Sequence, residues 1–256
     1  MSNLVRHAGD TERFLLDNRP ALHPLIPKRL ELLWIAGQRG KPGINADINS
    51  ATESVREIAD PDFEILGTNA VSADCTFNAE GGITLTTAGA ADDQMILLPH
   101  LDANQTAWTK YTWGTDREVW YECLWETGTN ITNAIIWNGL KLTNTQVSAT
   151  DADQVFVRYE NDVNSGKFQV VDSIGGTDVT TDSGITVVLS TKYHIAIKIN
   201  TDRTAEVYIN GQLVRITSAL TDAIDLIPYL GVEADGATAA KDITVHACRI
   251  SRLRGA

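Results

Sequence analysis

From residue 62 onward, apolar and polar residues alternate in short runs that are separated by turn residues. A period of two places one set of side chains on each face of a β-strand, and many short strands at regular spacing are typical of a sandwich or barrel. No helix of useful length fits this part of the chain. The pattern predicts an all-β domain, with strands expected over 63–66, 75–79, 82–87, 94–98, 118–126, 134–142, 154–159, 167–171, 185–189, 192–199, 205–209, 212–216, 227–232 and 243–250.

The clearest local pattern is a three-stranded meander over residues 192–216. Asn210-Gly211 lies between two alternating runs, and this dipeptide supplies the two positive-φ residues of a type I′ hairpin. In the preceding strand the alternation places four apolar side chains on one face, namely Tyr193, Ile195, Ile197 and Ile199. We therefore expect three consecutive antiparallel strands over 192–199, 205–209 and 212–216.

Residues 1–61 differ in kind from the rest, so we expect an N-terminal arm before a β domain at 62–256. Prolines at 20, 24 and 27 preclude a regular helix over 18–27. After Pro27 the spacing of Leu30, Leu33 and Trp34, with a stop at Gly37, predicts a helix, and a second short helix is expected over 50–59. The arm is too short to form its own core. Its apolar residues pack on its own sandwich or on a neighbouring subunit, or the segment frays.

The meander resembles a known family of β-sandwiches. Tyr193-His-Ile-Ala-Ile-Lys-Ile, a turn, and Ala205-Glu-Val-Tyr-Ile-Asn-Gly-Gln-Leu-Val resemble the concanavalin A-like and laminin G-like jelly roll, and the run from Ile243 to Leu253 fits that family's last strand. The resemblance implies two curved antiparallel sheets. It does not imply one function, because the scaffold serves lectins, glycan-cleaving enzymes and structural modules.

The whole chain also resembles bacteriophage virion proteins in which a proline-broken arm precedes a lectin-like jelly roll. This resemblance implies a capsid decoration or cement protein, assembled in the host cytoplasm as part of the virion, that binds the major capsid protein or other virion proteins. The alternative is a tail fibre or receptor-binding protein that binds a host-surface glycan. A homo-oligomer, dimer or trimer, is expected. The arm residues expected to contact the partner are Phe14, Leu15, Leu16, Leu30, Leu33 and Trp34.

Charge and composition narrow the classes of partner. The formal net charge is −12, and it falls on residues 61–256, because residues 1–60 hold eight basic and eight acidic side chains. An acidic body repels phosphate backbones, which argues against nucleic acid. No apolar run approaches the length of a membrane span and no secretory leader is recognisable, so we expect neither membrane insertion nor classical secretion.

Candidate catalytic chemistry is sparse. Glycan hydrolases of this scaffold carry carboxylates at alternate positions of one strand, and the nearest pattern here is Glu118, Glu122 and Glu126. Their spacing of four residues places neighbouring carboxylates roughly 13 Å apart, too far for a catalytic pair, so we expect these glutamates to meet solvent opposite core-facing Tyr121, Cys123 and Trp125. His194 is expected to be a half-buried strand residue. The sequence therefore predicts a protein that is not an enzyme and has no catalytic residues.

Binding residues are suggested by aromatic and acidic side chains. Trp108, Tyr111 and Trp113 lie in a polar stretch and could stack on a sugar ring or anchor a long connection in the core, whereas Trp137 stands in a strand. No metal site and no cofactor are predicted. Structural calcium is a weaker alternative, with loop oxygens from Asp151, Asp153, Asp172, Asp178, Asp182 and Asp202. The three cysteines lack metal-site spacing, and Cys123 and Cys248 are expected to be buried.

Overall fold

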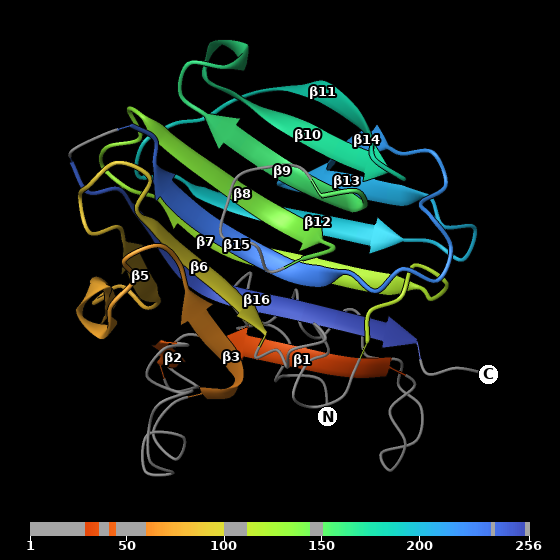
Figure 1. Cartoon of the computed structure of the whole chain (residues 1–256), viewed down its shortest axis with the longest axis horizontal. Coiled ribbons are helices and arrows are strands. Elements are labelled where there is room, and N and C mark those ends of the chain that lie inside the picture. Colours follow the sequence, from red (N-terminus) through yellow and green to blue (C-terminus); the bar gives the residue numbers. More distant parts are fainter. Residues whose placement is uncertain are drawn as a thin grey trace, which may run out of the picture.

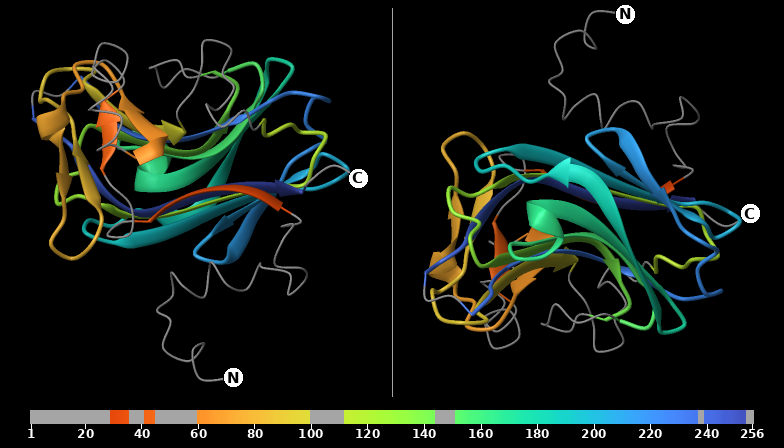
Figure 2. Two further views of the ribbon diagram at one scale, coloured as in Figure 1. Left: turned by 90° about the horizontal axis from the view of Figure 1, so that it is seen from below. Right: turned by 90° about the horizontal axis from the view of Figure 1, so that it is seen from above.

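The computed structural model describes residues 29–35, 41–44, 60–99, 112–143, 151–236 and 239–253. These residues form two β-sheets that pack face to face as a sandwich (Figures 1 and 2). Apart from strands, the described residues include two short 3₁₀ turns, η1 (Ser72–Asp74) and η2 (Asn164–Gly166). No helix in this part of the chain is long and apolar enough to span a membrane.

We call the first sheet the β7 sheet. Its strands run in the order β14-β13-β12-β7-β16-β5-β4, and β1 pairs with the part of β16 that extends beyond β5. All of its pairs are antiparallel. The bounds are β1 (Arg29–Ile35), β4 (Cys75–Phe77), β5 (Ile83–Thr86), β7 (Val119–Thr127), β12 (Lys192–Ile199), β13 (Ala205–Ile209), β14 (Gln212–Ile216) and β16 (Asp242–Leu253).

We call the second sheet the β8 sheet. Its order is β11-β10-β9-β8-β15-β6-β3-β2, and only the β2–β3 pair is parallel. The bounds are β2 (Pro42–Ile44), β3 (Asp60–Leu66), β6 (Gln94–Pro99), β8 (Ala134–Lys141), β9 (Gln154–Glu160), β10 (Lys167–Ile174), β11 (Thr177–Thr186) and β15 (Ile227–Ala234). The neighbours of β8 are β9 and β15, so chain segments almost 100 residues apart lie side by side.

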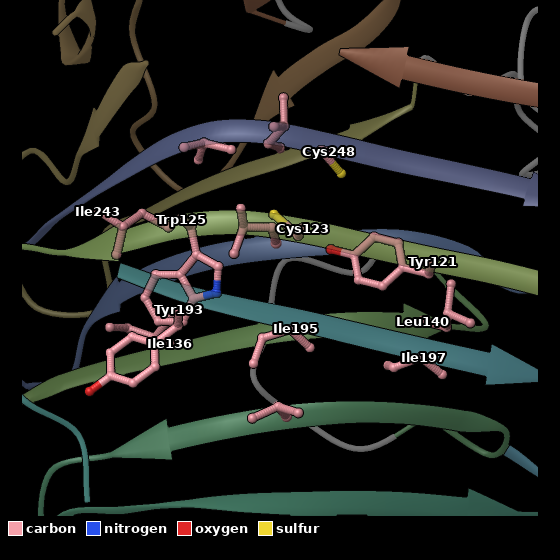
Figure 3. Close-up of a cluster of buried hydrophobic side chains, with 14 of the residues drawn as sticks. Tyr121, Cys123, Trp125, Ile136, Leu140, Tyr193, Ile195, Ile197, Ile243 and Cys248 are labelled. Atoms are coloured by element: carbon pink, nitrogen blue, oxygen red, sulfur yellow. The ribbon is translucent and has the colours of Figure 1, made fainter. Parts of the chain in front are cut away.

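The core lies between the inner faces of the sheets. Tyr121, Cys123 and Trp125 of β7 are at most 1% exposed, as predicted from the alternation in that strand. A polar link crosses the core, where the Tyr121 hydroxyl donates a 2.6 Å hydrogen bond to Asn138 Oδ1 of the opposite sheet. Figure 3 shows the side chains of Tyr121, Cys123 and Trp125 pointing into the space between the sheets.

The predicted meander is confirmed. Strands β12, β13 and β14 have the expected bounds, and Tyr193, Ile195, Ile197 and Ile199 are buried. At the hairpin Asn210 has φ 51° and Gly211 has φ 78°, the positive values that a type I′ turn requires. The Asn210 side chain also accepts a 2.8 Å hydrogen bond from the His194 backbone N–H, which ties the turn to β12.

The predicted helix after Pro27 is wrong. Residues 29–35 form β1, which pairs with β16 from Arg29↔Leu253 to Ile35↔Ala247. The backbone of Leu30, Leu33 and Trp34 therefore belongs to the sandwich of its own chain. Arg29 strengthens this attachment, because it donates hydrogen bonds to Glu118 Oε1 at 2.7 Å and to Ser251 Oγ at 3.1 Å. Pairing with a strand more than 200 residues away outweighs the local helical spacing.

The rest of the predicted arm cannot be compared. Phe14, Leu15 and Leu16, together with the helix expected over 50–59, lie outside the described residues. The short strand β2 adds a second N-terminal segment to the sandwich, on the β8 sheet. A helical arm that stands apart from the sandwich is therefore not supported.

Candidate functional site

The outer faces of the two sheets differ in chemistry. In β8, Ala134, Ile136 and Leu140 point into the core, so alternation directs Trp137 to the outside of the β8 sheet. By the same alternation Tyr229 of β15 and Phe156 of β9 face outward, and these rings belong to an apolar cluster separate from the sandwich core. We call the outer face of the β8 sheet around Trp137 and Tyr229 the aromatic face.

Two rings on the aromatic face are stacked. The centroids of Trp137 and Tyr229 lie 5.7 Å apart with an interplanar angle of 24°. Gly231 makes room for the indole, because a Cβ at this position would lie 2.9 Å from Trp137 Cζ2. Lys141 Nζ lies 4.7 Å from the Tyr229 ring centroid, within the range of a cation–π contact. Trp137 and Tyr229 are only 2% and 1% exposed in this structure.

Three buried polar atoms on the outer side of the β8 sheet lack partners, and two of them belong to Gln154 of β9, opposite Lys141, and Gln94 of β6, opposite Glu233. Trp137 Nε1, the Gln154 amide nitrogen and Gln94 Oε1 form no hydrogen bond with any described residue, and these side chains are at most 3% exposed. A buried donor or acceptor that stays unpaired costs about 1–3 kcal/mol, so native proteins rarely leave one without a reason. All three residues lie on the outer side of the β8 sheet, where a polar ligand would supply such hydrogen bonds.

Charged groups flank the aromatic face on both sides of Trp137. Arg158 lies opposite Trp137 on β9, and its guanidinium donates a 2.9 Å hydrogen bond to Gln169 Oε1. Glu160 and Glu233 occupy one row, each directly opposite Ile135 on the two strands beside β8. Burial raises the pKa of Glu233, although the 2.7 Å hydrogen bond from Gln94 Nε2 acts to lower it.

The aromatic residues singled out from the sequence are not part of this face. Trp113 is 2% exposed and belongs to the core between the sheets, so its ring is not presented to a sugar on the surface. Its position before the Gly114↔Asp225 bridge fits the alternative of a buried anchor for a long connection. Trp108 and Tyr111 lie outside the described residues.

The expectation that all three glutamates of β7 meet solvent is wrong for Glu122. Glu122 is 5% exposed, whereas the side chains of Glu118 and Glu126 are 25% and 29% exposed. Glu122 Oε2 lies 3.6 Å from Arg249 Nη1, and Oε1 lies 3.8 Å from His194 Nε2. Burial raises the pKa of Glu122 to about 7, and Glu31 acts in the same direction, whereas Arg249 acts against it.

His194 is a half-buried strand residue, as predicted. Its side chain is 30% exposed and lies on the outer face of β12, opposite Leu124 of β7. Burial lowers the pKa of its imidazole. A neutral imidazole and a carboxyl that titrates near neutrality therefore lie side by side on the outer face of the β7 sheet. The sequence did not reveal the pair of Glu122 and His194, because only the pairing of β7 with β12 in the sheet brings the two side chains together.

Among the described residues, no group of three His, Cys, Asp or Glu side chains is placed to hold a metal ion. The aspartates considered for calcium have other contacts. Asp172 forms an ion pair with Arg215 at 3.1 Å, and Asp202 accepts hydrogen bonds from the N–H and hydroxyl of Thr204 in a turn. Asp153 accepts hydrogen bonds from Gly175 N–H and the Thr221 hydroxyl.

Comparisons with known proteins bear on the fold. No protein-family model matches the sequence, and no curated protein matches it significantly. A protein of unknown function from Shewanella oneidensis MR-1 is structurally similar over 97% of this chain and 98% of its own, with a TM-score of 0.55 at 13% identity. The Bacillus licheniformis β-glucanase is similar with a TM-score of 0.51 at 11% identity, over 75% of this chain and 92% of its own.

A carbohydrate recognition domain is similar to the same extent. The domain of Emp46p in its potassium-bound form gives a TM-score of 0.53 at 9% identity, over 78% of this chain and 92% of its own. Alginate lyases also occur among the similar structures. The expectation that this chain is not an enzyme is overturned, because polysaccharide-cleaving enzymes share its fold. The chain has the concanavalin A-like jelly-roll fold found in lectins and glucanases.

Proposed function

We propose that this protein binds a polysaccharide on the aromatic face, and that it does so as a component of a bacteriophage virion. The observation that carries the binding proposal is the unpartnered indole N–H of Trp137, stacked on the ring of Tyr229, together with the unpartnered amide nitrogen of Gln154 on the neighbouring strand. A sugar ring has C–H groups on its faces and hydroxyls at its edge. It can therefore stack on an aromatic ring and form hydrogen bonds with neighbouring polar groups at the same time.

Binding at this face requires a change in the protein. The two rings are 2% and 1% exposed, so the ligand reaches them only when the face opens. Association that depends on such a change is slower than binding to a preformed surface. We therefore expect a slow association phase whose rate levels off at high ligand concentration.

A glycan array tests the binding proposal. The full chain should bind a defined set of polysaccharides, and Trp137→Phe, which keeps an aromatic ring but removes the N–H donor, should weaken binding by about tenfold. Trp120→Phe is the matched control, because Trp120 lies on the outer face of the opposite sheet, where Lys198 Nζ is 5.4 Å from its ring. Equal loss in both variants, or no binding by the full chain, contradicts the proposal.

A second candidate function is cleavage of the bound polysaccharide. Glu160 and Glu233 lie in one row two strands apart, which corresponds to about 9.5 Å, near the upper limit for the carboxyl pair of an inverting glycosidase. The raised pKa of Glu233 suits it to donate a proton. Glu233→Gln should then stop the release of reducing ends while binding persists. Absence of products from every bound polysaccharide would exclude this candidate.

The virion part of the proposal rests on the resemblance of the whole chain to virion proteins. Glycan binding suits a receptor-binding role. Capsid decoration, with the major capsid protein as partner and a dimer or trimer of this chain, stays a prediction. Because β1 and β2 belong to the sheets, a test of the arm should remove residues 1–28 and not residues 1–60. Undiminished attachment of this truncated chain to purified particles would refute the role of Phe14, Leu15 and Leu16.

A further inference from the structure

Two of the three cysteines face each other across neighbouring strands. Cys123 of β7 lies directly opposite Cys248 of β16 in the antiparallel ladder. Both side chains point into the core, where Cys123 is fully buried and Cys248 is 2% exposed. Figure 3 shows the two sulfur atoms beside Tyr121, in the middle of the β7 sheet. Neither cysteine is in a disulfide in this structure.

The spacing of the two strands suits a covalent bond. Directly opposed residues of an antiparallel pair have Cα atoms about 4.5–5.5 Å apart. This range falls within the Cα separations of about 4.4–6.8 Å that disulfides span. The two thiols are close enough to interact by a hydrogen bond, which also contributes to the raised pKa of Cys123, although burial is the larger cause. Bond formation therefore requires rotation of two side chains and little movement of the backbone.

We propose that Cys123 and Cys248 form a reversible disulfide across β7 and β16 when the protein meets a low-molecular-weight disulfide such as oxidised glutathione. One thiolate attacks the glutathione disulfide and releases one glutathione thiol, and the second thiolate then displaces the other glutathione. One sulfur–sulfur bond breaks and one forms. The cysteine pair loses two electrons and two protons, which leave as two molecules of reduced glutathione.

The bond would lock the centre of the β7 sheet. β7 and β16 are neighbours in this sheet, and β16 also pairs with β1 and β5. A covalent link between β7 and β16 therefore also stabilises the position of β1, which pairs with β16. The chain between the two cysteines forms most of the sandwich, and closing so long a loop restricts the unfolded state strongly. A protein folded under reducing conditions would thus gain stability after transfer to an oxidising medium.

The experiment uses the full chain at equilibrium with oxidised and reduced glutathione. Because the thiols are buried, the exchange is run in native buffer, at urea concentrations below the unfolding transition, and during refolding. Free thiols are then alkylated in denaturant, and intact mass and peptide maps are recorded. We expect one alkylated cysteine, Cys75, and a Cys123–Cys248 link with a loss of about 2 Da. Cys75→Ser should keep the link and Cys248→Ala should abolish it.

Two results would overturn the proposal. The first is three alkylated cysteines under all three conditions, and the second is a link that contains Cys75, which lies on β4 opposite Leu85. The stabilising effect has a separate readout, the midpoint of thermal unfolding. It should be several degrees higher for the oxidised chain, return to its starting value after reduction, and show no change in Cys248→Ala. A lower midpoint after oxidation would refute the locking role.

Discussion

Glu122 should lower the free energy of unfolding of this protein as the pH rises from mildly acidic to neutral. The carboxyl has its ordinary pKa of 4.5 in the unfolded chain and a pKa of about 7 in the fold, where burial is the main cause. Between these values the folded protein keeps a proton that the unfolded chain has lost. The contribution of Glu122 to the free energy of unfolding therefore decreases as pH rises through this window and levels off above it.

The magnitude follows from the shift. One pKa unit corresponds to about 1.4 kcal/mol, so the shift of Glu122 amounts to about 3 kcal/mol between pH 4.5 and pH 7. The side chain is only 6% exposed, so solvent screening reduces this value little. The ion pair with Arg249 already opposes the shift, and its geometry, 3.6 Å between Nη1 and Oε2, is too long for a strong hydrogen bond.

Glu122→Gln is the corresponding perturbation, because an amide of the same shape does not titrate. Urea unfolding followed by tryptophan fluorescence at about pH 5, 6, 7 and 8 gives the free energy of unfolding of both proteins. We expect the stability of the variant relative to the parent to increase by about 2.5 kcal/mol from pH 5 to pH 8, slightly less than the full shift because this range does not extend below pH 4.5. Effects of other titrating groups cancel in this difference, since both proteins share them.

The matched control is Glu126→Gln on the same face of β7, where the side chain is 29% exposed. The stability of this variant relative to the parent should not reproduce the increase expected for Glu122→Gln, because the Glu126 side chain is not buried. A constant difference for Glu122→Gln, or one that decreases as pH rises, would show that Glu122 is not held protonated by the fold, and the reasoning from burial would be refuted.

Three further substitutions test the turn, the polar contact between the sheets and the aromatic face. Gly211→Ala should lower the free energy of unfolding by about 1 kcal/mol, because φ is 78° at this position, and an unchanged urea midpoint would contradict the assigned turn. Arg215→Leu should lower the free energy of unfolding by about 3–5 kcal/mol, because it leaves the carboxylate of Asp172 buried and unpaired. The double variant with Asp172→Asn should regain much of this stability, and a double variant as unstable as Arg215→Leu would refute the pairing. Gly231→Ala should displace the Trp137 indole and therefore weaken glycan binding, measured by titration calorimetry. An unchanged affinity would show that the glycan does not bind at this ring.

The sequence predicted the part of the fold that local patterns specify. Strands β12, β13 and β14 were predicted with correct bounds, because alternation and the Asn210-Gly211 turn are short-range features. β1 was predicted as a helix because only its pairing with β16, more than 200 residues away, makes it a strand. β11 runs over Thr177–Thr186, and most of it was missed, because an edge strand rich in Thr and Asp lacks an apolar face.

The candidate site was harder to predict than the fold. Trp137 was recognised as a strand residue, but every residue of β8 is buried, so the strand has no alternation from which its outer face could be read. The partners of Trp137 come from β9 and β15, whose order in the sheet no local pattern reveals. Glu122 was expected to meet solvent because the sequence does not place Arg249 and His194 beside it.

Binding of a sugar by the indole N–H of Trp137 is tested most directly by nuclear magnetic resonance of the six tryptophan indole N–H groups. Trp137→Phe identifies the signal that belongs to Trp137. Titration with a polysaccharide fragment that binds on the array should shift this signal strongly and leave that of Trp120 unchanged. A fragment that binds while the Trp137 signal stays in place would contradict the proposed site.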